Sequence, residues 1–287
     1  LAESTRLDTL IPRRIKQLED LTALGVLTVA DLDRLDQRTI DLCEGGASNL
    51  AGHIELARAR VGWSPAYRKR GLERVEVARG DVEVDVDMES TNDGCYLWGA
   101  LLTDRRVPGS PSTYVSFATW DDEIEAGELV AFEDFWSWFR GVRERAHAEG
   151  ATFRAYCYSR SAEQRQMTRL ADRLGLREEV DEFLASDEWV DLYDVVKAQL
   201  VTGRSMGLKV VAPLAGFEWR FDDAGGTLAM VKYDQAVDDD GSGGVGGTNA
   251  QQWILDYNED DVRATAALRG WLDGDASALP SIADALD

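Results

Sequence analysis

The sequence has few of the residues that build disulfide frameworks and zinc sites. Its 287 residues include three cysteines and two histidines. Cys43, Cys95 and Cys157 are far apart and form no CxxC pair, so neither a disulfide framework nor a structural zinc site is indicated, and we expect ordinary buried thiols. His53 and His147 are too few imidazoles for a zinc-type catalytic site. Any metal must therefore be held mostly by oxygen, which favours Mg²⁺ or Mn²⁺.

Long apolar runs are also absent. No run reaches the ~18 apolar residues of a membrane-spanning helix, and the N-terminus lacks the charged-then-apolar pattern of a signal peptide. These absences predict a soluble, cytoplasmic protein without a membrane partner. The first residue is Leu1 rather than Met, which suggests a processed chain or a piece of a longer chain with an upstream domain.

Positive charge is scarce. The net charge of −22 argues against a broad basic face and against tight electrostatic binding of a long duplex. It does not exclude a nuclease, because basic residues can be concentrated locally. Only five of the 31 basic residues are lysines, and arginine is the better residue for forked phosphate contacts. The acidic excess would equally serve solubility.

Residues 1–62 read as a small all-α region of short helices. Thr28 is a good N-cap for a helix that follows a turn at Gly25, and a third helix is expected over about 49–61. The order resembles a helix-hairpin-helix module, a fold that often grips a nucleic-acid backbone through a glycine turn and a helix N-terminus. A role in packing alone is the alternative.

A basic linker is predicted over residues 63–80, and we place the domain boundary there. Its positive residues could hold phosphates beside an acidic site, or they could simply be solvated, which is common for such runs. They are Arg68, Lys69, Arg70, Arg74 and Arg79.

Residues 81–287 have the pattern of an α/β domain. Three successive strands imply an antiparallel meander, and the strand and helices that follow are the order of a mixed sheet flanked by helices. Strands are expected at 82–90, 96–102, 113–117 and 152–158. Helices are expected at 128–148, 162–174, 189–197, 207–214 and 250–272, with a mobile loop or a plain connector at 238–248.

The strand Val82–Ser90 alternates between apolar and acidic residues. Residues two apart share a face of a strand, so Asp87 and Glu89 lie side by side, where like charges repel unless a cation lies between them. A solvated outer face is the alternative. We expect Glu83 and Asp85 of the same face to lie in solvent or behind the metal ligands.

A further acid interrupts the apolar stripe of the last predicted helix. Asp261 falls in the buried line, and a lone buried carboxylate costs several kcal/mol unless it is paired or bound to a metal. Tyr257 lies one turn earlier on the same face. The stripe consists of Ile254, Tyr257, Asp261, Ala264, Leu268 and Leu272.

Together these motifs resemble a known class of enzymes. Asp87-Met88-Glu89 on an early strand and Tyr257 with Asp261 on a late helix resemble the DxE and YxxxD motifs of DEDDy-type 3′–5′ exonucleases, which have a ribonuclease-H-like fold. Residues from about 82 to 272 look more closely like the predicted ribonuclease-H-like domain of RecB-like nuclease family proteins. Leu208-Lys209 and Gly216-Phe217-Glu218-Trp219 belong to this resemblance. Each motif alone is weak, whereas their order is more specific.

The family pattern also requires a middle acid, usually Asp, after a strand. The matching stretch runs from Tyr156 to Glu163 and puts Glu163 in that position. Glu is longer by a methylene, so a metal would be held differently or through water. Asp191 is the competing candidate, and we favour Glu163.

The resemblance implies a hydrolase, a 3′–5′ exonuclease that cleaves phosphodiester bonds with two Mg²⁺ or Mn²⁺ ions. Asp87 would bridge both ions, Glu89 and Asp261 would complete one, Glu163 would support the other, and Tyr257 would orient the attacking water. The implied substrate is single-stranded DNA or RNA, with DNA and a role in DNA repair favoured. A catalytically silent nucleic-acid-binding module and an acidic scaffold protein are the alternatives. Weaker candidates for phosphate contacts are Arg68, Lys69, Arg70 and Lys209.

Overall fold

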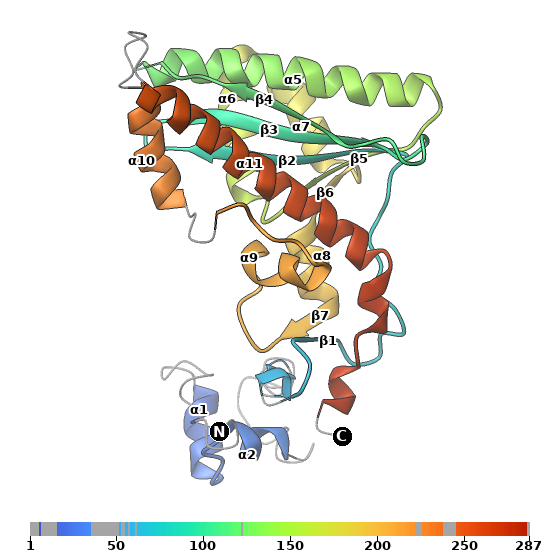
Figure 1. Ribbon diagram of the computed structural model, residues 1–287. Coiled ribbons are helices and arrows are strands. Elements are labelled where there is room, and N and C mark those ends of the chain that lie inside the picture. Colours follow the sequence, from blue (N-terminus) through green and yellow to red (C-terminus); the bar gives the residue numbers. More distant parts are fainter. Residues whose placement is uncertain are drawn as a thin grey trace. The chain divides into compact units, whose positions relative to one another are not determined.

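The computed structural model describes residues 6, 16–35, 52, 55–56, 58–60, 62–121, 123–221, 226–237 and 245–285 (Figure 1). The chain divides into two compact units. The terminal unit consists of Leu1–Glu76, Val195–Val210 and Trp271–Asp287, and the sheet unit consists of Val77–Asp194 and Val211–Gly270. The domain boundaries predicted at residues 62 and 80 stay predictions.

The terminal unit begins with two short helices, α1 (Lys16–Ala23) and α2 (Val29–Asp33). The turn between them contains Gly25, whose φ of +82° favours glycine. Thr28 is the N-cap of α2 as predicted: its hydroxyl accepts from the Asp31 amide at 3.1 Å, and the Asp31 carboxylate accepts from the Thr28 amide at 3.0 Å. The predicted third helix at 49–61 falls largely outside the described residues.

The same unit contains a two-stranded antiparallel sheet of β1 (Ala66–Arg68) and β7 (Leu200–Thr202). Further short elements within the described ranges of the whole chain are α8 (Leu192–Gln199), α9 (Leu208–Val211), η2 (Ala212–Ala215), η3 (Asp275–Ala278) and η4 (Ile282–Asp284). The predicted helix at 207–214 therefore consists of α9 and η2.

The sheet unit is built on a five-stranded mixed sheet of order β4-β3-β2-β5-β6. Its first three strands form the predicted antiparallel meander, whereas β5 and β6 add in parallel beside β2. The predicted mixed sheet flanked by helices is confirmed in this unit, whereas the helix-hairpin-helix likeness of residues 1–62 stays a prediction. The strands are β2 (Val82–Ser90), β3 (Cys95–Asp104), β4 (Thr113–Ala118), β5 (Phe153–Cys157) and β6 (Trp189–Asp191).

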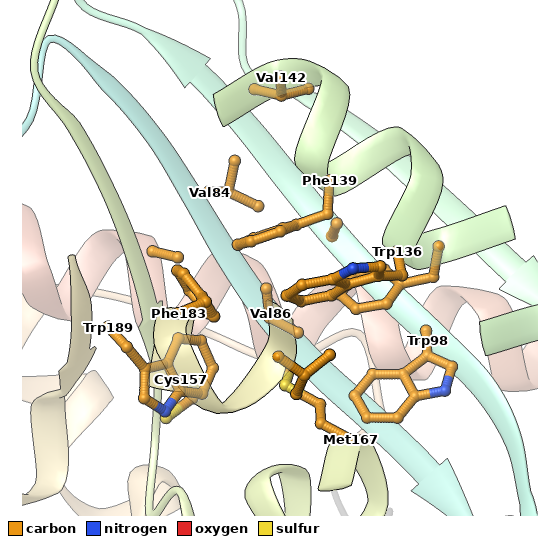
Figure 2. Packing of buried hydrophobic residues seen from close by; sticks show 14 of the residues in the cluster. Val84, Val86, Trp98, Trp136, Phe139, Val142, Cys157, Met167, Phe183 and Trp189 are labelled. Carbon is orange, nitrogen blue, oxygen red and sulfur yellow. The ribbon is translucent and has the colours of Figure 1, made fainter. Parts of the chain in front are cut away.

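One face of this sheet forms the main hydrophobic core. The valines of β2 pack there against aromatic side chains of α5 (Ile124–Ala148) and against α6 (Ser161–Leu174) and α7 (Arg177–Ala185). Figure 2 shows Val84 and Val86 beside Phe139 and Trp136. Cys95 and Cys157 are buried free thiols, as expected. This packing turns the alternate residues of β2, which are acidic, toward the other face.

The other face is covered by α11 (Val245–Leu272), which crosses the sheet in Figure 1. At one end α11 packs with α10 (Gly226–Val237), where the Tyr233 ring stacks on Tyr96 at 4.1 Å between centroids. No helix within the described ranges is long and apolar enough to cross a membrane.

Two predicted elements differ from the structure. Residues 189–197 were expected to be one helix, but Trp189–Asp191 form β6 because they pair in parallel with β5 and Trp189 packs in the core. The spacing of apolar residues in one continuous helix also fits a three-residue strand that runs directly into a helix. This spacing therefore cannot distinguish the two structures. Residues 245–248 of the predicted loop at 238–248 are helical, since α11 already begins at Val245, and residues 238–244 lie outside the described ranges.

A buried carboxylate joins α5, α6 and the start of β3. Glu128 is 0% exposed, accepts from the Cys95 amide at 2.9 Å, and pairs with Arg169 at 2.7 Å and with Arg173 at 2.8 Å. Burial raises the pKa of Glu128, but the hydrogen bonds from Arg169 and Cys95 and the two arginine charges outweigh it, so the pKa lies below the usual value. Glu128 thereby fixes α6, whose first turn contains Glu163.

Replacing Glu128 by Gln is expected to destabilise the protein by about 2 kcal/mol at neutral pH, because it removes charged hydrogen bonds. A folded pKa that lies below the unfolded value of about 4.3 makes this contribution complete above pH ~4.3 and lost as the pH falls through the folded pKa. Urea unfolding at several pH values would measure the difference. Exposed Glu133 on the same helix gives the matched control, Glu133→Gln; an equal loss in both variants would contradict the prediction.

Candidate metal centre

Four acids of β2 lie on the face of the sheet that α11 covers. We call Glu83, Asp85, Asp87 and Glu89 the acid row; the valines between them point into the opposite core. Two residues of α11 donate hydrogen bonds to the acid row, Arg269 to Glu83 and Asn258 to Asp87. The row therefore has two halves with different partners.

The half nearest the start of β2 is neutralised by arginine. Glu83 and Asp85 are both 0% exposed. Arg269, 2% exposed, donates to Asp85 at 2.9 Å and to Glu83 at 3.3 Å, and Arg79 donates to Glu83 at 2.7 Å. The Arg269 guanidinium lies 4.4 Å from the centroid of the Tyr156 ring. Of the two alternatives for these acids, a position in solvent is wrong, because both side chains are buried and paired with arginine; a position behind the metal ligands stays a prediction.

In the other half of the acid row, Asp87 and Glu89 lie close to a third acid, Asp261. Asp87, Glu89 and Asp261 each offer a carboxylate oxygen, and these oxygens all lie within 4.8 Å of one another. The two β2 residues share a face because they are two apart, and Asp261 reaches them from α11. Three oxygen donors at such spacing suit a hard divalent cation such as Mg²⁺ or Mn²⁺.

The electrostatics of this cluster fit a cation. Burial raises the pKa of Asp87 well above its usual value, and the charges of Glu89, Asp261 and Glu163 raise it further. Among the described residues, the Glu83 and Asp85 pair forms its ion pairs with arginines, whereas the three clustered acids face one another. A divalent ion would relieve that repulsion.

Two donors fix Asp261. The Trp219 indole N–H donates to its Oδ1 at 2.7 Å, and the Tyr257 hydroxyl also hydrogen bonds to it. Burial and the acids Asp261, Glu89 and Asp87 raise the pKa of Tyr257, so its hydroxyl stays protonated at neutral pH. Asp261 is half-buried rather than fully buried as predicted; its neighbour Asp260 is the buried one and accepts from the Arg220 amide at 2.8 Å.

The two candidates for the middle acid differ in their partners. Glu163 is 5% exposed, and its Oε2 has no hydrogen-bond partner among the described residues. Burial, together with Asp191, raises the pKa of Glu163 to about 7. The Asp191 carboxylate accepts instead from three backbone amides, those of Ser159 at 2.8 Å, Arg160 at 3.0 Å and Tyr193 at 2.9 Å. Asp191 thus holds the turn before α6, where Ser159 has a φ of 70°.

Sequence reasoning gave no site role to three residues of this centre, Asn258, Tyr114 and Trp219. Asn258 donates to Asp87 Oδ2 at 2.9 Å and accepts from the Tyr114 hydroxyl at 2.8 Å, and Trp219 binds Asp261. Asn258 is 0% exposed although it lies beside the predicted apolar stripe rather than in it. A polar residue next to the YxxxD tyrosine was a signal that could have found it.

The basic residues predicted to bind phosphate belong to the terminal unit. Arg68 donates to the backbone carbonyls of Leu279, at 2.8 Å, and of Leu72 and Glu73. Its guanidinium therefore serves the packing of that unit. Nucleic-acid contacts by Arg68, Lys69, Arg70 and Lys209 stay predictions.

Comparison with known proteins gives one match. Residues 86–273, more than half of the chain, match the family model described as the RNase_H superfamily. The match begins within β2 and ends just after α11, so it includes the three clustered acids, Glu163 and Tyr257. No curated protein and no solved structure was found to match the chain.

Proposed function

The chain belongs to the RNase_H superfamily, and on this basis we propose that it is a metal-dependent nuclease that hydrolyses single-stranded nucleic acid, as a 3′–5′ exonuclease with DNA as the favoured substrate. The observation that supports the proposal most directly is the cluster of Asp87, Glu89 and Asp261, with oxygens within 4.8 Å of one another. The exonuclease polarity rests on the DxE and YxxxD motifs alone.

Each residue of the centre has a chemical role in this proposal. Asp87, Glu89 and Asp261 would hold a divalent cation, and Glu163 would hold a second one with the carboxylate oxygen that has no partner among the described residues. Such cations supply Lewis-acid stabilisation of the phosphoryl oxygens and lower the pKa of a bound water. Tyr257, fixed by Asp261, stays protonated and would orient the attacking water through its hydroxyl. Trp219 would keep Asp261 in place.

The test is hydrolysis of oligonucleotides by the purified full chain. A single-stranded DNA labelled at its 5′ end should be shortened stepwise with Mg²⁺ or Mn²⁺ and remain intact with EDTA. The same strand blocked at its 3′ end should resist, because a 3′–5′ exonuclease needs that end. Parallel RNA and duplex substrates would rank the substrate classes.

Two outcomes would contradict the proposal at different levels. Internal cuts in the blocked strand would disprove the exonuclease polarity while leaving a metal-dependent nuclease. If no DNA or RNA is cleaved with either metal, while the chain still binds single strands, the result would favour a silent binding module instead.

A further inference from the structure

The amide of Asn258 lies between two strands and contacts both through its polar atoms. Asn258 is on α11 and fully buried; its Nδ2 donates to Asp87 Oδ2 on β2 at 2.9 Å, and its Oδ1 accepts from the Tyr114 hydroxyl on β4 at 2.8 Å. We propose that Asn258 is a positioning residue, which holds the Asp87 carboxylate in the orientation that the metal centre needs. This inference rests on the proposed function.

The direction of the two hydrogen bonds follows from chemistry. An ionised carboxylate only accepts, so the NH₂ group of Asn258 must face Asp87. The amide oxygen is then turned to the other side and needs a donor, which the Tyr114 hydroxyl provides. Tyr114 thus fixes the amide, and the amide fixes the carboxylate. Asp, with the same shape, would place an acceptor where Asp87 requires a donor.

On a third strand, β3, a glycine leaves room for the Asn258 amide because it has no side chain. Gly99 on β3 is paired directly with Asp87, so any side chain there would point to the same face. A Cβ at Gly99 would lie 1.6 Å from Asn258 Oδ1 and 3.1 Å from the Tyr114 hydroxyl oxygen. The amide occupies the space that a side chain at position 99 would fill, so glycine is required by the polar contact and not by a turn.

The hydrogen bond from Asn258 holds a carboxylate that other carboxylates repel. Asp87 lies among Glu89, Asp261 and Glu163, all of which repel it. Without a donor on the opposite side, its carboxylate would rotate away from the other acids and lose the arrangement that a cation requires. The backbone amide of Met88 also donates to Asp87, but among the described residues it is the bond from Asn258 that links the carboxylate to α11, the helix that contributes Asp261.

The test measures Mn²⁺ affinity of the full chain, by electron paramagnetic resonance of the unbound ion, besides hydrolysis of single-stranded DNA. Losing a partner that orients a metal ligand weakens metal binding about 10–100-fold. We expect losses of this size for Asn258→Asp and Gly99→Ala, and a smaller one of about threefold for Tyr114→Phe. The melting temperature should fall least for Tyr114→Phe, which introduces neither a buried charge nor a clash. In the double variant Gly99→Ala/Asn258→Ala, Mn²⁺ affinity should equal that of Asn258→Ala alone.

Two matched controls carry the same substitutions elsewhere. Asn92→Asp adds the same charge at an exposed turn, and Gly270→Ala adds a Cβ that would meet no atom within 4 Å; both should bind Mn²⁺ like the unaltered chain. If Asn258→Asp fails to fold, Tyr114→Phe decides, because it keeps the ring and removes only the hydroxyl.

The outcomes separate this inference from the proposed function. Unchanged Mn²⁺ affinity in Asn258→Asp and Tyr114→Phe, with Asp87→Asn still inactive, would overturn the positioning role and leave the nuclease standing. An additive loss in the double variant would overturn the assignment of Gly99. If the unaltered chain binds no Mn²⁺ and cleaves nothing, the proposed function fails first and the inference falls with it.

Discussion

Asp87→Asn should abolish hydrolysis while making the metal-free protein more stable. The amide keeps the shape of Asp87 and can still accept from Asn258, but it removes the charge at the centre of the three-acid cluster. Metal-ion catalysis supplies several kcal/mol, so we expect a loss on the order of 10³-fold in kcat. Relief of repulsion should add about 1 kcal/mol to the free energy of unfolding and raise Tm by about 2–4 °C.

In Asp87→Asn, kcat should fall while the free energy of unfolding rises. This combination distinguishes loss of a metal ligand from misfolding, because a misfolded variant would lose both activity and stability. Adding Mg²⁺ should raise the Tm of the unaltered chain by mass action but not that of Asp87→Asn. The control is Asp134→Asn, which removes an exposed acid of α5 and should change neither quantity. Residual hydrolysis above a tenth of the unaltered rate would show that Asp87 is not a ligand.

The second large effect is on folding and involves the other half of the acid row. Arg269→Met should destabilise the protein by about 3–5 kcal/mol, because breaking a buried ion pair leaves uncompensated charge. Two carboxylates that are 0% exposed, Glu83 and Asp85, would lose this partner together. Urea unfolding at neutral pH, with fluorescence and circular dichroism as separate probes, would measure the loss.

The buried carboxylates, rather than the missing arginine packing, should account for most of this effect. The triple variant Arg269→Met/Glu83→Gln/Asp85→Asn removes the charges together and should recover at least half of the lost stability. Arg263→Met on the same helix breaks a partly exposed pair with Glu259 and should cost no more than about 1 kcal/mol. A triple variant as unstable as Arg269→Met alone would disprove the electrostatic explanation.

Part of the candidate metal centre could be predicted because it follows local periods. Asp87 and Glu89 share a face through the two-residue period of a strand, and Tyr257 and Asp261 share one through the four-residue spacing of a helix. The core valines of β2 follow the same alternation, which is why the mixed sheet and its acidic side were both predicted.

The other residues of the site could not be predicted, because their positions depend on which helices and strands pack together. The local spacing of apolar and polar residues does not contain that information. Arg269 and Asn258 are buried because they lie opposite acids more than 170 residues away, whereas arginine and asparagine are usually exposed. The sequence left Glu83 and Asp85 either in solvent or behind the metal ligands for the same reason: their burial requires the arginine that α11 supplies. Trp189 belongs to a strand only because β5 offers it a partner.

The late position of α11 in the chain determines when the acid cluster can assemble during synthesis. Its Asn258 follows Asp87 by 171 residues, and Arg269 follows Asp85 by 184. During synthesis, β2 leaves the ribosome long before the helix that compensates its charges, and chains emerge at about 5–20 residues per second. For that interval the nascent sheet has four carboxylates on an uncovered face and cannot assemble the cluster. The proposed nuclease would therefore stay inactive until its late helix has been translated and has docked.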